Sequence, residues 1–89
     1  MKIISDVVMQ KVGGLHVAVA VGARAKELPC MIKLNESGAF LWALASEMEE
    51  IDIDALALAL EREYEISPEV ARADTERFVN TLVESGLTE

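Results

Sequence analysis

The stretch Ile32 to Leu44, IKLNESGAFLWAL, changes its hydrophobic period partway through. Ile32-Lys33-Leu34 alternates apolar and polar residues, as a half-buried strand does, whereas from Asn35 onward apolar residues recur at three- and four-residue steps, as on a helix. Asn35 stands at the junction, where its side-chain oxygen can accept a hydrogen bond from the first helical turn. Glu36 then places negative charge at the positive end of the helix dipole. The stretch therefore predicts a strand that runs directly into a capped helix.

The residues before this corner have the pattern of a small antiparallel sheet. Val7 to Val12 and Leu15 to Val21 are rich in β-branched residues. Gly13-Gly14 between them suits a two-residue hairpin turn, because glycine takes positive φ without steric cost. A polar loop from Gly22 to Pro29 follows, and a third strand is predicted from Cys30 to Leu34. The short connections favour antiparallel pairing.

The second predicted strand has one large and one small face, because successive side chains point to opposite sides. We expect the large face to pack in the core. The small face either lies close beneath another layer or is lightly exposed. The large face carries Leu15, Val17, Val19 and Val21, and the small face carries His16, Ala18 and Ala20.

Three helices are predicted after the strands. The first runs from about Glu36 to Met48 and has Gly38 in its first turn, which costs ~1 kcal/mol relative to alanine. The second is capped by Asp52 or Asp54, and the third runs from Ser67-Pro68 to a stop at Gly86. The expected buried stripes are Ile53, Leu56, Ala57, Leu60 and Tyr64 on the second helix, and Val70, Ala71, Phe78, Val79, Leu82 and Val83 on the third.

These elements predict an α+β fold in which a three-stranded antiparallel sheet is followed by three helices, a winged-helix-like arrangement with the sheet first. We expect the 89 residues to form one domain, residues 1–89. The N-terminus lacks the features of a secretory signal, and no apolar run reaches the ~20 residues of a membrane span. With a single cysteine, Cys30, the chain is expected to be cytoplasmic, with no membrane partner.

Charge separates the two parts of the sequence. The net charge is −8; residues 1–34 hold five basic and two acidic residues, whereas residues 35–89 hold three basic and fourteen acidic ones. Such a balance disfavours nucleic acid as a partner. A winged-helix transcription regulator is the first alternative that the outline suggests, but its recognition helix, Ser67 to Gly86, would be net negative. The uneven distribution is that of a well-solvated helical surface, or it gives the first third a mildly basic edge that suits an acidic partner.

Motifs for catalysis or cofactor binding are absent from the sequence. There is no CxxC, HExxH, P-loop or GxGxxG pattern. His16 and Cys30 have no companion residues at a spacing that suggests a general base or an activated thiol. We therefore expect no enzyme activity, no cofactor and no metal. An exposed strand edge is a template for backbone pairing, so an extended peptide or a second copy of the chain could add to the sheet. The second possibility makes a homodimer the other alternative.

Two runs of this sequence, IKLNESGAFLWAL and DALALALEREYEISPEVARADTERFVNTLVESGL, resemble the PqqD-like family. The resemblance covers nearly the whole chain, and the combination of positions in this order carries it. The matching positions are Leu34-Asn35, Ser37-Gly38-Ala39, Leu41-Trp42, Leu44, Tyr64, Asp74, Phe78 and Gly86-Leu87.

The resemblance implies a recognition element for ribosomally synthesised and modified peptides, with three strands packed on three helices. It implies that the leader of a precursor peptide pairs with the third strand, opposite the third helix from about Ala71 to Leu82. It also implies a second partner, a modifying enzyme such as a radical S-adenosylmethionine maturase, for which this chain is a noncatalytic adaptor. The pathway stays open between PQQ and another peptide pathway. The implied peptide-binding residues are Cys30, Met31, Ile32, Lys33, Leu34, Ala71, Asp74, Thr75, Phe78 and Leu82.

Overall fold

The strands form one antiparallel sheet in the computed structural model, which describes residues 1–4, 7–20 and 32–89. The sheet has the order β1 (Val7–Val12), β2 (Leu15–Ala20) and β3 (Ile32–Leu34). The hairpin is where it was predicted, but of its two turn glycines only Gly13, with φ 64°, has a positive φ. Positive φ at the first of two loop positions is the pattern of a type II′ turn. The predicted loop from Gly22 to Pro29 lies outside the described residues.

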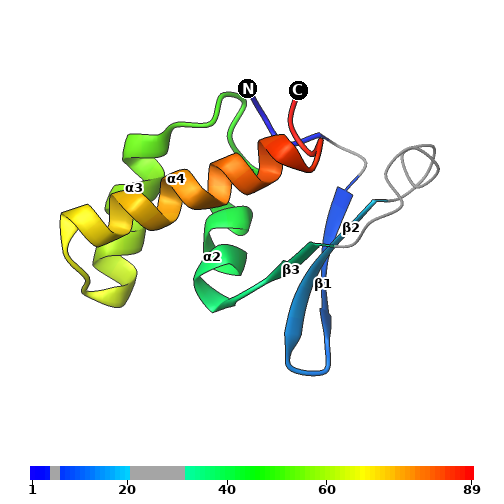
Figure 1. The fold of residues 1–89 in the computed structure, drawn as a ribbon, viewed down its shortest axis with the longest axis horizontal. Coiled ribbons are helices and arrows are strands. Elements are labelled where there is room, and N and C mark those ends of the chain that lie inside the picture. Colours follow the sequence, from blue (N-terminus) through cyan, green and yellow to red (C-terminus); the bar gives the residue numbers. More distant parts are fainter. Residues whose placement is uncertain (5–6, 21–31) are drawn as a thin grey trace.

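Three helices follow the sheet, as predicted, so the α+β fold is confirmed. They are α2 (Glu36–Ala45), α3 (Ile53–Tyr64) and α4 (Pro68–Glu84), and all three lie to one side of the strands (Figure 1). The helix α2 ends at Ala45, three residues before the predicted Met48. None of the helices in the described ranges has the length and hydrophobicity needed to cross a membrane.

Side-chain caps begin each helix, because the first backbone N–H groups of a helix lack partners within it. Asn35 Oδ1 accepts from the Gly38 N–H at 2.7 Å, as the sequence predicts. Asp52, not Asp54, caps α3 by accepting from the Ala55 N–H at 3.1 Å. Ser67 caps α4, and Pro68 occupies its first turn.

The end of α4 leads into a contact between the two ends of the described chain. Gly86 has φ 75°, and the Leu87 N–H donates to the Leu82 carbonyl at 3.0 Å, as in a Schellman motif. Lys2 and Glu89 then exchange two backbone hydrogen bonds, of 2.9 and 2.8 Å. The two ends therefore lie side by side next to the end of α4 (Figure 1).

The main core cluster lies between the helices and the small face of β2, so another layer does lie close above that face. The prediction that the large face is buried holds for Val17, which is 6% exposed but outside this cluster, and is wrong for Leu15. Ala18 is buried in the same cluster as Leu41 and Trp42 of α2, whereas Leu15 of the large face is 50% exposed. The register places Ala18 beside Met9 and Ile32, both of which pack against that cluster. A small side chain at this position fits a helical layer packed close above it.

Three of the residues predicted for the helical stripes lie at the surface. Val70 and Val83 are about half exposed, and Tyr64 is 37% exposed. Tyr64 instead makes an edge-to-face contact with Phe40 of α2, with ring centroids 5.9 Å apart. The remaining predicted stripe residues of α4 are buried: Ala71, Phe78, Val79 and Leu82.

Candidate functional site

The strand β3 is at one edge of the sheet, paired with β2 on one side only. In the described part of the chain, no strand pairs with its other side. Its backbone register is set by β2, with Ile32 opposite Ala18 and Leu34 opposite His16. An edge of this kind offers backbone N–H and C=O groups to a further strand.

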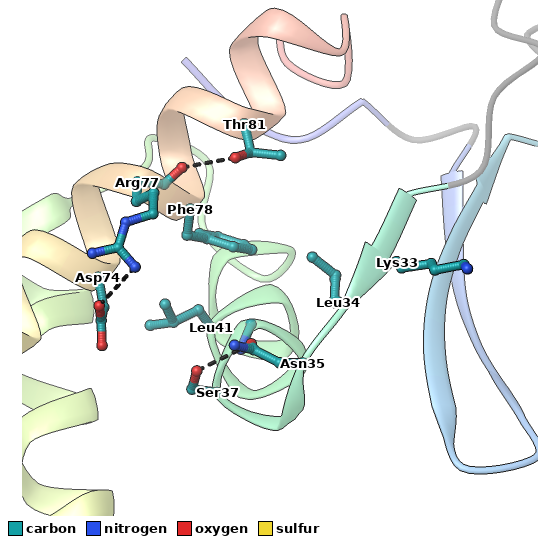
Figure 2. A pocket seen from close by; sticks show the side chains of 10 residues that line it. Lys33, Leu34, Asn35, Ser37, Leu41, Asp74, Arg77, Phe78 and Thr81 are labelled. Carbon is teal, nitrogen blue, oxygen red and sulfur yellow. Dashed lines mark hydrogen bonds and ion pairs between the residues drawn. The ribbon is translucent and has the colours of Figure 1, made fainter.

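A groove of about 460 Å³ lies beside this edge. One wall is β3 with the first turn of α2, and the opposite wall is the middle of α4 (Figure 2). The walls are held apart by the corner at Asn35, where the chain turns from strand into helix. The groove is lined by Lys33, Leu34, Asn35, Ser37, Gly38, Leu41, Asp74, Arg77, Phe78 and Thr81.

The centre of the groove is apolar. Leu34 from β3, Leu41 from α2 and Phe78 from α4 converge there (Figure 2). Leu41 is 1% exposed and Phe78 is 7% exposed, so both are anchored in the core, while Leu34 is half-buried. The groove therefore has a fixed apolar floor that suits an apolar side chain.

The rim of the groove is polar and internally bonded. Ser37 donates from its hydroxyl to Asn35 Oδ1 at 3.1 Å, and Thr81 donates from its hydroxyl to the Arg77 carbonyl at 2.9 Å. An Arg77 nitrogen lies 3.2 Å from Asp74 Oδ1, one turn back along α4. Figure 2 shows this ion pair at the end of the groove near Asn35 and Ser37, and Lys33 pointing away from α4.

Gly38 allows this rim to form. A Cβ atom at this position would lie 3.0 Å from Asn35 Oδ1 and 3.4 Å from Leu34 Cβ. The first distance is too short for an unstrained contact, so a side chain here would displace the cap of α2 or the last residue of β3. The sequence marked Gly38 only as a weak point of the helix; the close approach depends on the corner that the folded chain makes.

The structure brings four of the predicted site residues to the groove: Lys33, Leu34, Asp74 and Phe78. Ala71, Thr75 and Leu82 are 0% exposed and lie in the core behind the groove wall. Ile32 is half-buried and packs against the same core. Cys30 and Met31 lie outside the described residues. The role of all ten in binding stays a prediction.

Helical geometry explains which residues of α4 were missed. At 3.6 residues per turn, Asp74, Arg77 and Thr81 lie on one side of Phe78, and Ala71, Thr75 and Leu82 lie on the other. Phe78 is therefore at the boundary between groove and core. The spacing Asp74, Arg77, Phe78, Thr81 is a helix face that the sequence could have revealed. The other missed lining residues are Asn35, Ser37, Gly38 and Leu41.

No cluster of metal-binding side chains occurs within residues 1–4, 7–20 and 32–89. The groove has no Cys or His among its lining residues, and its single carboxylate, that of Asp74, is engaged by Arg77. What it combines is a free strand edge, an apolar floor and a charged rim. Recognition of an extended chain segment needs these features, since edge pairing supplies affinity and side-chain pockets supply specificity.

Comparison with solved structures gives the same fold. The chain matches "TbiB1 in Complex with the TbiA(beta) Leader Peptide" with a TM-score of 0.75 and 21% sequence identity, over 100% of this chain and 95% of that one. No curated protein matches the chain. The family model described as coenzyme PQQ synthesis protein D (PqqD) matches residues 23–87. The match includes β3 and all three helices, and the chain belongs to the PqqD family.

Proposed function

We propose that this chain is a noncatalytic adaptor that binds the leader segment of a ribosomally made precursor peptide. The leader adds as a fourth strand along the free edge of β3, inside the groove that α4 closes. The single observation that carries the proposal is this edge, open beside an apolar floor. The family and the fold shared with TbiB1, a protein solved with a leader peptide, support the same reading.

The edge and the floor contribute different parts of the binding energy. Each backbone hydrogen bond along β3 contributes about 0.5–1.5 kcal/mol net, and three residues can form only a few of them. One apolar side chain buried against Leu34, Leu41 and Phe78 adds about 1.5–3 kcal/mol. An affinity in the micromolar range needs ~8 kcal/mol, so we infer that binding depends on both.

The second proposed partner is a modifying enzyme to which the bound precursor is presented. A radical S-adenosylmethionine maturase is the type that the resemblance to PqqD-like proteins implies. The leader would occupy the groove between β3 and α4, which leaves the exposed face of α3 for such an enzyme.

An NMR titration tests the proposed peptide site. Labelled protein is titrated with synthetic leaders from the open reading frames that neighbour its gene. We expect shifts in Ile32–Leu34, the first turn of α2 and residues 74–81 of α4. Shifts located elsewhere would overturn the proposed site. If no leader produces shifts and the protein forms a dimer in solution, β3 pairs with a second copy instead.

A matched pair of variants tests the groove without removing the core. Thr81→Trp places a large ring at the rim, whereas Asn80→Trp adds the same ring to an exposed position of α4 outside the groove. We expect Thr81→Trp to weaken leader binding about tenfold or more, the equivalent of ~1.4 kcal/mol, and Asn80→Trp to leave it unchanged. Equal affinities for the two variants would exclude the groove as the binding site.

A further inference from the structure

Arg77 lines the groove and forms an ion pair with a second lining residue, Asp74. Its side chain is 74% exposed, whereas that of Asp74 is 33% exposed. The guanidinium is therefore the more accessible member of the pair. An exposed i, i+3 ion pair of this kind contributes little to stability. The guanidinium keeps donors beyond the one directed at Asp74, since an arginine carries five N–H groups.

The two walls of the groove have matching lengths. Three residues of β3 span ~10 Å at about 3.3 Å per residue. The residues from Asp74 to Thr81 on α4 span a similar ~10 Å at 1.5 Å per residue. Because side chains of an added strand alternate between faces, only two of them, at positions i and i+2, face α4 within this length.

The two peptide side chains at these positions face different groups of the protein. One faces the apolar floor at Phe78, Leu34 and Leu41. The other faces the guanidinium of Arg77, which lies about one helical turn from Phe78 because the side chain reaches back to Asp74. A separation of about 6.6 Å between alternate side chains matches this step along the groove.

We infer that Arg77 determines specificity for an acidic side chain in the bound peptide, two residues from an apolar side chain that fills the floor. The inference rests on the proposed function, since it assumes that the peptide adds to β3. An incoming carboxylate takes the exposed donors of Arg77 in a charge-assisted hydrogen bond. Lys33 also lines the groove, but its side chain points away from α4 (Figure 2), so Arg77 is the cation that faces this position.

The net charge of −8 does not oppose this pairing at physiological salt. Charges further than a Debye length of about 8 Å are largely screened there, and the molecule extends over 39 × 30 × 19 Å. Near the groove the exposed donors of Arg77 are the closest charged groups on α4, with Asp74 less exposed beside them.

Selection from a displayed library of short random peptides tests the inference directly. The original protein, Arg77→Glu, and Arg62→Glu are used as separate targets. Arg62 is exposed on α3 and outside the groove, so its variant makes the same charge change as a control. For the original protein and Arg62→Glu we expect a selected apolar residue with Asp or Glu two positions away. For Arg77→Glu we expect Lys or Arg at that second position.

Binding of two peptides that differ only at the charged position gives the magnitude. We expect Arg77→Glu to weaken binding of the Asp peptide about two- to fivefold and to strengthen binding of the Lys peptide, since an exposed charge pair is worth no more than this. An apolar residue selected without any charge preference would overturn the role of Arg77 and leave the proposed function standing. Peptides that bind Thr81→Trp as well as the original protein would overturn both.

Discussion

Thr75 is fully buried in α4, and its hydroxyl has no hydrogen-bond partner among the described residues. A buried hydroxyl without a partner costs about 1–3 kcal/mol of desolvation free energy. The residue is flanked by Ala71, one turn earlier, and Phe78, nearly one turn later, both in the core. Its methyl group suits this environment, whereas its oxygen does not.

Thr75→Val is therefore expected to stabilise the protein. The change replaces the hydroxyl with a methyl group of the same shape, and we expect the free energy of unfolding to rise by about 1 kcal/mol. Urea unfolding followed by circular dichroism measures it. Thr81→Val is the control, because the Thr81 hydroxyl donates to the Arg77 carbonyl at 2.9 Å, so no gain is expected there. A loss of stability in Thr75→Val would mean that its hydroxyl is bonded in solution.

At the scale of elements, the corner between β3 and α2 determines the shape of the groove. Leu34 ends the strand, Asn35 caps the helix, and Gly38 lets the two approach. On helix propensity alone, Gly38→Ala should gain ~1 kcal/mol. The 3.0 Å approach to Asn35 Oδ1 opposes this gain, and loss of an N-cap costs about 0.5–2 kcal/mol.

We expect the steric effect to win, so that Gly38→Ala lowers the free energy of unfolding by about 1 kcal/mol. The double variant with Asn35→Ala provides the control, because the close oxygen is then absent. In that background Gly38→Ala should cost less or even stabilise, since neighbouring residues are not additive when they share a contact. A single variant more stable than the original protein would show that the corner relaxes easily.

Signals carried by a few adjacent residues were read correctly from the sequence, whereas the choice of packing face was not. Asn35, Ser67-Pro68 and Gly86 act on backbone groups within one turn, so their pattern is sufficient to predict where a helix begins or ends. Which face of β2 packs against the helices depends on the layer that covers the strand in the folded chain. Leu15 and Ala18 did not reveal which face meets the helices, because a small residue that admits a helix looks, in sequence, like a lightly exposed one.

The sequence was sufficient to predict where the groove lies but not which residues line it. Resemblance to a family indicated the third strand and the third helix, and both form its walls. Which side of α4 faces the groove follows from how α4 packs on α2 and α3, and that packing involves residues far apart in the chain. Arg77 and Thr81 were missed for this reason, and Ala71 and Leu82 proved to be core.

At the scale of the whole molecule, acidic charge is concentrated in the helical part. Fourteen of the sixteen acidic residues occur after residue 34, against three of the eight basic residues. Arg72 bonds Asp54 of α3 and, at 2.9 Å, Glu76 of α4, and Arg77 pairs with Asp74. These pairs are all at least partly exposed, and exposed ion pairs contribute little.

We therefore expect general repulsion to outweigh the ion pairs, so that salt stabilises the fold. At 0.01 M salt the Debye length is about 30 Å, comparable with the 39 × 30 × 19 Å molecule, and at 0.15 M it falls to about 8 Å. Raising the sodium chloride concentration between these values should raise the urea midpoint of unfolding. Repulsion between like charges destabilises the compact folded state, and salt screens that repulsion. The double variant Glu47→Gln, Glu63→Gln changes two exposed acids and should show a smaller increase. A midpoint that falls with salt would mean that the attraction within the Arg72 and Arg77 pairs dominates, and then Arg72→Gln should remove most of the salt dependence.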